Sequence, residues 1–251
     1  MYETLFLGNE KINLEKVDST NTYLKRLVAT NKKCMEGIVV TAKNQYSGRG
    51  QRGSYWQSEP SQNLTFSLLL KPNIAVVDQF MLSKVISLGI RDFLIYKEIK
   101  HVTIKWPNDI YVEDNKIAGI LIENVLKGNR VEAAIVGVGL NVNQTTFGGD
   151  VINATSLKQI QSKEFYLHEM LQQLLFAIEK RYLMLKNLNF FDLNRDYVKY
   201  LFQLNKTSQY EVNHHIVQGE IVDVSKSGKL QININGVVKE FDLKEVKFVM
   251  Q

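Results

Sequence analysis

Four apolar segments follow one another so closely between residues 102 and 143 that only short turns fit between them. The segments are VTIKW, DIYVE, KIAGILIENV and RVEAAIVGVGLNV, with turn signals such as EDNK and KGNR between them. Parallel strands need long crossover connections, whereas antiparallel strands can be joined by tight turns. The spacing therefore predicts an antiparallel meander and argues against the regular strand–helix alternation of a doubly wound fold.

Helical patterns flank this meander, and a β-rich segment ends the chain. Amphipathic helices are predicted after the capping signal DSTN and across residues 77–97, 164–186 and 190–204. From about residue 206 the chain consists of short β segments and turns, among them the hairpin signal Asn235-Gly236. We expect an α+β fold with a mixed, mainly antiparallel sheet and flanking helices over residues 1–204, and a small β-barrel-like domain over residues 205–251.

The composition narrows the classes of function. A single cysteine, Cys34, excludes an internal disulfide framework and fits a reducing, cytoplasmic compartment. The chain shows no signal-peptide pattern and no apolar run long enough to span a bilayer, so no membrane partner is expected. A formal net charge of +5 suits a nucleic acid, an acidic protein or an anionic small substrate, and equally a scattered lysine-rich surface.

The stretch QYSGRGQRGSYW at residues 45–56 contains the pattern G-x-G-x-x-G. A dinucleotide-binding turn requires this pattern to open a helix, but here SYWQSEPSQ and a strand follow Gly53, so we reject that interpretation. Glycines leave a loop mobile, and Arg49 and Arg52 between them supply forked donors for phosphate or carboxylate. The loop either closes over an anion or is an ordinary solvated hairpin loop.

Three further clusters suit an anion or the close approach of a ligand. Lys105 in IKWPND is a compact charge at a strand end, although an edge-strand lysine that points into water is the alternative. Lys116 precedes the apolar strand of NKIAGILIE. In GVGLNVN, Gly137 and Gly139 alternate within a strand, which permits close approach by a ligand or a backbone and is also typical of a bulge.

The order of these motifs resembles the biotin protein ligases. DSTN, Gln45 with GRGQRG, KWPND, KIAGIL and GVGLNVN occur in the family's order between about residues 12 and 157. The segment GEIVDVSKSGKLQI is similar to the family's small C-terminal domain. The resemblance implies a class II synthetase-like catalytic domain followed by an SH3-like β-barrel. Because the motifs begin at Asp18, it also implies the monofunctional type without an N-terminal DNA-binding domain, so no DNA partner is expected.

The activity of that family has two steps. ATP activates the carboxyl group of biotin as biotinyl-5′-AMP with release of pyrophosphate, and a lysine ε-amine of an acceptor protein then displaces AMP. The resemblance therefore implies biotin and ATP as substrates, and Mg²⁺ that accompanies ATP rather than a side-chain metal site. It implies a biotin carboxyl carrier protein or domain as the acceptor, and it leaves room for a homodimer.

The resemblance also assigns roles to residues. Lys105 and Arg49 are the expected catalytic residues, which stabilise charge where carboxylate and phosphate meet. The residues expected to contact biotin are Ser19, Thr20, Asn21, Gln45, Arg49, Gly50, Gln51 and Lys105. The residues expected to contact ATP or the adenylate are Arg49, Arg52, Trp56, Lys116 and Asn141. Trp56 and Trp106 are the two tryptophans, and both are expected either to wall the ligand slot or to pack in the core.

One position departs from the pattern of the family. Many members carry arginine in place of Gln51, and glutamine keeps hydrogen-bonding capacity but has no charge. We therefore expect this loop to hold the adenylate less tightly, with Arg52 or backbone N–H groups compensating.

Three alternatives stay open at this point. A lipoate or octanoate ligase or transferase of the same fold would share much of this chemistry. A nucleic-acid-binding module is a more distant alternative, because the sequence has no interleaved basic and aromatic stripe. The polar residues of DSTN can also cap a helix without binding any ligand.

Overall fold

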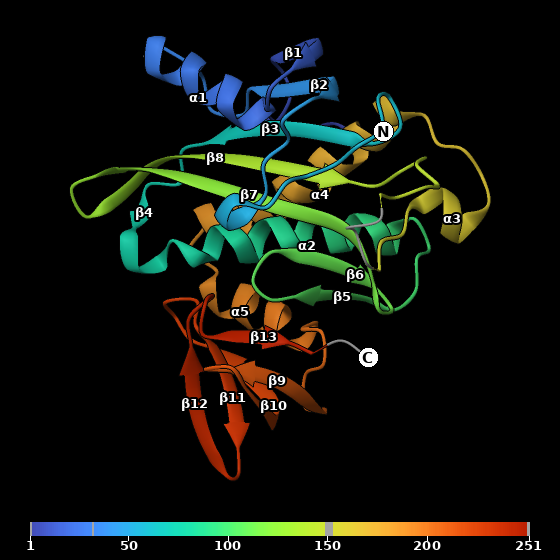
Figure 1. Cartoon of the computed structure of the whole chain (residues 1–251). Coiled ribbons are helices and arrows are strands. Elements are labelled where there is room, and N and C mark those ends of the chain that lie inside the picture. Colours follow the sequence, from blue (N-terminus) through green and yellow to red (C-terminus); the bar gives the residue numbers. More distant parts are fainter. Residues whose placement is uncertain (1, 32, 149–152, 250–251) are drawn as a thin grey trace.

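The computed structural model describes residues 2–31, 33–148 and 153–249, and the side chain of Arg52 lies outside the described part. Two β-sheets organise the chain (Figure 1). The larger sheet has the strand order β1-β2-β3-β8-β7-β6-β5, with β4 paired to β8. Its strands are β1 (Lys11–Val17), β2 (Val39–Gln45), β3 (Leu64–Leu70), β4 (Ile74–Ala75), β5 (Val102–Lys105), β6 (Asp109–Val112), β7 (Asn115–Lys127) and β8 (Arg130–Leu140).

The pairing of the larger sheet confirms the predicted meander. Strands β5 to β8 pair in sequence order, and each of these pairs is antiparallel. Among the described pairs of this sheet, only β1 with β2 is parallel. The sheet is therefore mixed and mainly antiparallel, as expected from the short turns between its apolar segments.

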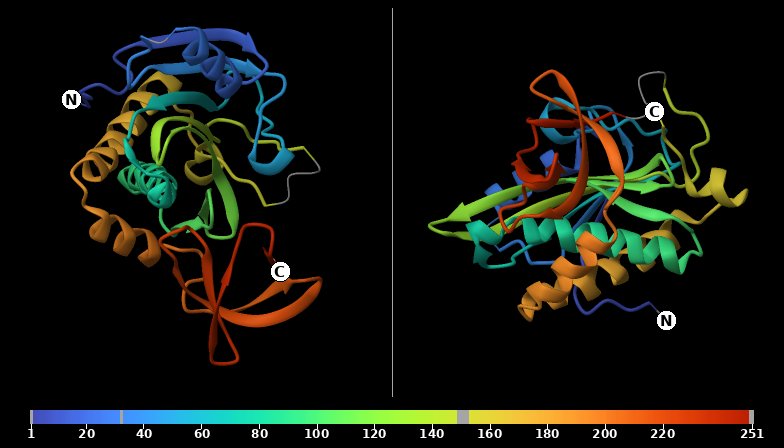
Figure 2. Two further views of the ribbon diagram at one scale, coloured as in Figure 1. Left: turned by 90° about the vertical axis from the view of Figure 1, so that its left-hand side faces the viewer. Right: turned by 90° about the horizontal axis from the view of Figure 1, so that it is seen from below.

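Five helices occur among the described residues, and α1 and α2 cover opposite faces of the larger sheet. They are α1 (Thr20–Thr30), α2 (Phe80–Tyr96), α3 (Leu157–Gln161), α4 (Leu167–Lys186) and α5 (Phe190–Lys199), with short 3₁₀ helices at Gln51–Gly53 and Val76–Asp78. Leu24 of α1 packs with Leu69 and Ile135 of the sheet on one face, in a separate apolar cluster. Helix α2 covers the other face, and α4 packs against α2 (Figures 1 and 2). No helix among the described residues is long and apolar enough to cross a membrane.

The last predicted helix is shorter than expected. Helix α5 ends at Lys199 rather than continuing to residue 204. Instead, the Ile104 N–H donates to the Tyr200 carbonyl at 2.8 Å, and the Phe202 N–H donates to the Ile104 carbonyl at 2.8 Å. The connector thus pairs with the outer edge of β5, where exposed backbone groups would otherwise need water or another chain.

The second sheet is built entirely from the C-terminal segment. Its strands, in the order β12-β11-β10-β9-β13, are β9 (Thr207–Val212), β10 (His215–Val224), β11 (Leu230–Ile234), β12 (Val237–Phe241) and β13 (Val246–Phe248). The predicted hairpin at Asn235-Gly236 is confirmed, with positive φ angles of 53° and 83°. The sheet lies next to α5 and β5 (Figure 1), and the Trp106 indole donates to the Gly228 carbonyl at 2.9 Å.

A buried lysine lies where α2 meets α5 and the second sheet. Lys84 is 1% exposed, and its Nζ donates to Asn194 Oδ1 at 2.7 Å. The ammonium lies 5.5 Å from the ring centroid of Phe80 and 5.4 Å from that of Tyr197. Burial lowers the pKa of Lys84 from 10.5 to about 8, against the opposing charge of Asp223. The buried ammonium therefore opposes folding at neutral pH.

Replacing Lys84 with methionine should stabilise the protein at pH 7 by about 1–2 kcal/mol, because it removes a buried charge. The unfolded chain holds the lysine proton up to about pH 10.5 and the folded chain only to about pH 8. Wild-type stability should rise with pH across this window, so the advantage of Lys84→Met should shrink there. Chemical denaturation at both ends of the window measures this. A variant less stable than wild type at pH 7 would contradict it.

Candidate active site

One row of residues crosses the face of the larger sheet that lies opposite α2, here called the open face. The register pairs Lys105 with Asp109, Asp109 with Gly119, Gly119 with Gly139, and Gly139 with Thr65. Directly opposed residues of antiparallel strands point to the same face. Three strand spacings separate Lys105 from Gly139, which is about 14 Å. The row therefore connects the β5 edge of the sheet with its centre.

Two glycines of this row, Gly119 and Gly139, form a flat strip that the indole ring of Trp56 covers. A Cβ atom at Gly139 would overlap the ring, and one at Gly119 would lie 3.1 Å from Trp56 Cζ3. Close approach by a ligand or a backbone was predicted for the glycines of β8. The structure places side chains there instead, with Trp56 of the 45–56 loop on Gly139 and Asn21 of α1 against Gly137. The Trp56 Nε1 is buried without a hydrogen-bond partner among the described residues. No hydrogen bond of the indole therefore holds the ring in this position, and its buried, unpaired N–H is costly.

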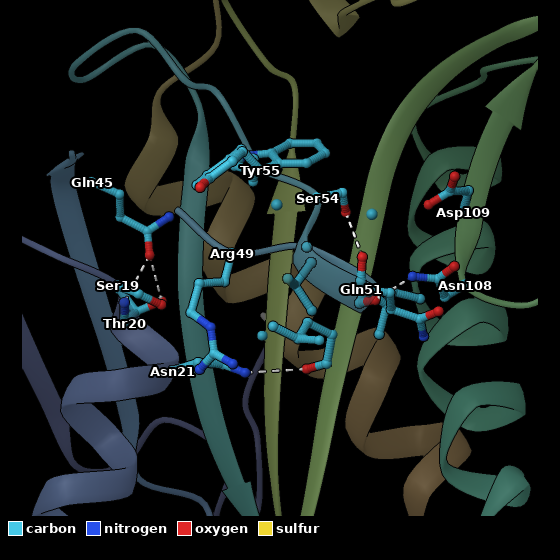
Figure 3. Close-up of a pocket in the computed structure, with 18 of the residues that line it drawn as sticks. Ser19, Thr20, Asn21, Gln45, Arg49, Gln51, Ser54, Tyr55, Asn108 and Asp109 are labelled. Carbon is cyan, nitrogen blue, oxygen red and sulfur yellow. Dashed lines mark hydrogen bonds between the residues drawn. The ribbon is translucent and has the colours of Figure 1, made fainter. Parts of the chain in front are cut away.

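A polar cluster lies where the end of β2 meets the start of α1, and it consists of Ser19, Thr20, Asn21 and Gln45. It lines one pocket together with Trp56 and the two glycines. Gln45 Oε1 accepts from the Thr20 N–H at 2.7 Å and from the Thr20 hydroxyl at 3.0 Å (Figure 3). Ser19 occupies the N-cap position, yet its side chain makes no capping hydrogen bond. Gln45 therefore supplies the capping oxygen from the end of β2. Ser19, Thr20 and Asn21 are nearly completely buried, which is unusual for residues that only cap a helix.

The 45–56 loop closes on itself beside this cluster. The Gly50 N–H donates to the Ser54 carbonyl at 2.7 Å, and the Ser54 hydroxyl donates to the Gln51 carbonyl at 2.7 Å. The pattern ends in a 3₁₀ helix of three residues, Gln51–Gly53, and the next element is strand β3 rather than an α-helix, so rejection of the dinucleotide-binding turn is confirmed. Arg49, Gly50 and Gln51 all line the pocket. The side chain of Arg49 runs toward Asn21 (Figure 3).

Opposite charges meet at the other end of the pocket. Lys116 Nζ lies 2.7 Å from Asp109 Oδ1 and 5.7 Å from the ring centroid of Trp56. The backbone of Lys116 is held on both sides, because its N–H donates to the Asn153 carbonyl and its carbonyl accepts from the Thr155 N–H. Lys116 lines the pocket with its charge paired to Asp109, and its expected contact with ATP stays a prediction.

Lys105 lies at the end of the same row but is not among the described residues that line the pocket. Its Nζ donates to the Tyr111 hydroxyl at 3.1 Å. The ammonium also lies 4.7 Å from the Tyr111 ring centroid and 5.1 Å from that of Phe248 in the second sheet. Burial lowers the pKa of Lys105, Asp109 opposes this shift, and the charge of Lys116 adds to it. An incoming anion would favour the charged form of Lys105.

Three other predicted residues have different outcomes. Asn141 is buried, and its side-chain amide donates to the Thr155 carbonyl at 3.0 Å, in a smaller pocket next to Trp56. Trp106 does not wall the slot, because its indole is buried against the second sheet and bonded to Gly228. The predicted contact of Arg52 falls on a side chain outside the described part.

The structure also adds residues that the motifs did not single out. Ser54, Tyr55, Asn108 and Asp109 line the pocket, and Glu123 binds Arg49 just beyond it. A signal for Glu123 was present in NKIAGILIE, since period-two alternation places Glu123 on the same strand face as Gly119. Asp109 likewise belongs to KWPND, directly opposite Lys105 in the hairpin.

Comparison with known proteins decides the family. The model of the biotin/lipoate A/B protein ligase family matches residues 14–141, just over half of the 251 residues. The chain belongs to this family. The matched segment contains every motif that lines the pocket, from the polar cluster of α1 to the glycines of β8.

Several known proteins are similar to this chain over most of its length. A bifunctional ligase/repressor BirA of Bacillus subtilis is 26% identical over 241 residues, covering 95% of this chain and 74% of the relative. That of Bacillus spizizenii is 31% identical over 183 residues, and the match spans 56% of its length. A biotin protein ligase from Aquifex aeolicus, solved in complex with biotin and ATP, is 27% identical with a TM-score of 0.79. That comparison covers 97% of this chain and 100% of the Aquifex chain, and it places the whole fold among the biotin protein ligases.

Replacing Gly139 with alanine should displace Trp56 from the glycine strip, because the added methyl group overlaps the indole ring. The fluorescence emission of the empty protein should then shift to longer wavelength as the ring enters water. Trp106 is buried and hydrogen-bonded, so its emission should stay constant, and Trp56→Phe identifies the Trp56 signal. Unchanged emission in Gly139→Ala would show that Trp56 does not lie on the strip.

Proposed function

We propose that the chain is an ATP-dependent ligase that activates biotin as biotinyl-5′-AMP and transfers biotin to a lysine of a biotin carboxyl carrier protein. One observation carries the proposal: a single pocket joins the buried polar cluster of α1 to the glycine strip and to Lys116. A bicyclic ureido compound with a carboxylate tail needs these features in this order. The similarity over 97% of the chain to the Aquifex ligase, solved with biotin and ATP, supports the assignment.

The polar cluster suits the ureido ring of biotin. That ring presents one carbonyl and two N–H groups, and Ser19, Thr20, Asn21 and Gln45 offer both donors and acceptors. Because Gln45 caps α1, the Ser19 hydroxyl is not needed as the cap. A buried polar site of this kind disfavours ligands that leave its groups unpaired, which gives discrimination against compounds without the ureido group.

The charged end of the row suits the reacting anions. In the first step a carboxylate oxygen of biotin attacks the α-phosphorus of ATP, and pyrophosphate leaves. Negative charge accumulates where two anions approach, so Lys105, Lys116 and Arg49 are proposed to stabilise it. In the second step the neutral ε-amine of the acceptor lysine attacks the carbonyl carbon. The C–N bond forms, AMP leaves with the electrons of the C–O bond, and the nitrogen loses a proton.

The nucleotide is proposed to lie toward Trp56, Arg52 and Asn141. Gly50 and Gln51 would cover the adenylate from the loop. Asp109 is the one acidic residue among the described residues of the pocket, and its carboxylate is paired with Lys116. No group of three or more His, Cys, Asp or Glu suited to a metal occurs in the described ranges. We therefore propose that Mg²⁺ enters bound to ATP, where it would neutralise phosphate charge.

The remaining proposals concern partners and domains. The second sheet uses only residues 207–248, which supports a division into a catalytic unit, residues 1–204, and an SH3-like unit, residues 205–251. Cys34 is a buried free thiol, which fits the proposed cytoplasmic location. The carrier-protein acceptor, a homodimer and the absence of DNA binding stay predictions.

A lipoate or octanoate ligase is the second candidate, because the matching family model includes lipoate ligases. The buried polar cluster favours biotin, since neither the dithiolane ring of lipoate nor the alkyl chain of octanoate has a ureido group to pair with it. Exchange of pyrophosphate into ATP, measured with each of the three acids, separates these candidates.

Biotin-dependent exchange of pyrophosphate into ATP tests the first step, with lipoate and octanoate as parallel substrates. Exchange is expected with biotin alone. Lys105→Gln should lower the rate by about 10²–10³, because one charged donor to the transition state is lost. Lys100→Gln is the matched control, since Lys100 is exposed and lies just before the same strand. Exchange with lipoate instead would reassign the substrate, and exchange with none of the three would reject the proposal.

Gln51→Arg tests the departure in the loop. Restoring the charge should slow the escape of biotinyl-5′-AMP several-fold, since a charge-assisted hydrogen bond to phosphate is stronger than a neutral one. The rate at which free biotinyl-5′-AMP appears in the absence of acceptor measures the escape. Equal leakage from the wild type and the variant would show that the charge at residue 51 does not hold the adenylate.

A further inference from the structure

Glu123 connects the polar cluster to the 45–56 loop, although it belongs to neither. It lies in β7 on the open face, two residues beyond Leu121, and its side chain is 19% exposed. Its carboxylate accepts hydrogen bonds from Asn21 Nδ2 at 3.2 Å and from Lys25 Nζ at 3.1 Å. The guanidinium of Arg49 lies 3.4 Å from the same carboxylate. One side chain therefore contacts α1 and the loop together.

The contact with Glu123 helps to fix the orientation of the Asn21 side chain. Asn21 Nδ2 donates to Glu123 Oε2 and, at 3.4 Å, to the Leu121 carbonyl. On the other side, Asn21 Oδ1 accepts from the Ser67 hydroxyl at 2.5 Å. Two acceptors at the nitrogen and one donor at the oxygen allow a single orientation of the amide. A ligand can therefore use only those hydrogen-bonding positions of the Asn21 amide that these contacts leave free.

The contact with Arg49 is the weakest of the three. It is the longest, at 3.4 and 3.5 Å, and the Arg49 side chain is 47% exposed. If Arg49 leaves, Glu123 keeps the ammonium of Lys25 and the amide of Asn21. The carboxylate is then still paired, so departure of Arg49 avoids the large cost of a buried unpaired charge. Arg49 is thus an exchangeable partner.

The electrostatics agree with a charged carboxylate at this position. Burial opposes ionisation of Glu123. The hydrogen bonds from Lys25 and Asn21 and the nearby Arg49 outweigh this effect and lower the pKa of Glu123. Glu123 is consequently ionised at neutral pH and competes with any other anion for Arg49.

We propose that Glu123 is a positioning residue that fixes the Asn21 amide and holds Arg49 in the empty site until the carboxylate of the ligand takes Arg49 over. This inference rests on the proposed function, since it takes biotin as the ligand. Glu123 then has two separable effects. By fixing the Asn21 amide, Glu123 affects the binding of any ligand that contacts Asn21. By holding Arg49, it affects only the binding of a ligand that carries a negative charge.

Isothermal titration calorimetry with two ligands separates the effects. Biotin carries the carboxylate, and biotinamide keeps the ureido ring but is neutral. Glu123→Gln keeps an acceptor for Asn21 but removes the charge that holds Arg49. The ratio of the biotinamide Kd to the biotin Kd should rise about two- to fivefold, which corresponds to the strength of an exposed ion pair. Glu123→Ala should also weaken both ligands by about tenfold, because Asn21 loses an acceptor.

Glu132→Gln is the matched control, because Glu132 lies on the neighbouring strand, is 52% exposed and pairs only with Lys127 among the described residues. Its ratio of the two Kd values should equal that of the wild type. An unchanged or lowered ratio in Glu123→Gln would overturn the inference, even if Glu123→Ala fails to fold. A wild type that binds neither ligand would overturn the proposed function itself and this inference with it.

Discussion

The pairing of Gly119 with Gly139 across β7 and β8 is the constraint on which the site depends. Side chains at these positions would stand up from the open face and separate the polar cluster of α1 from the lysines at the β5 edge. Without them the sheet surface is flat enough for a planar ring, and Trp56 lies there in this structure. A glycine inside a strand weakens it, so two opposed glycines are best explained by what must lie on them.

Each positive charge of the site whose side chain the structure describes has a partner. Lys116 pairs with Asp109 at 2.7 Å, and Arg49 pairs with Glu123 at 3.4 Å. Lys105 lies against Tyr111 and the ring of Phe248. Cations packed together without partners would repel one another, and Lys116 already contributes to the lowered pKa of Lys105. These partners keep the positive charges in place, and we propose that a carboxylate and phosphates replace them when the substrates bind.

The sequence predicted those parts of the molecule that local patterns determine. Apolar runs and turn signals sufficed for the β5–β8 meander and for the hairpin at Asn235-Gly236, and glycines within a strand pointed to close approach. Contacts between distant segments were not predictable in this way. Trp106 was a candidate for the slot because of its motif, but its partner Gly228 is 122 residues away. Glu123 was missed because its role depends on Asn21 and Arg49, which meet it only in the folded chain.

A crystal structure with a non-hydrolysable analogue of biotinyl-5′-AMP would show whether one ligand spans the site from the polar cluster to the lysines. We expect the ureido ring against Ser19, Thr20 and Asn21, the phosphate beside Lys105 and Lys116, and Trp56 moved off the glycine strip. Arg49 should lie at the carboxyl end of biotin rather than at Glu123. An analogue bound away from the open face, or one bound with Trp56 still on Gly119 and Gly139, would show that the glycine strip is not the ligand site.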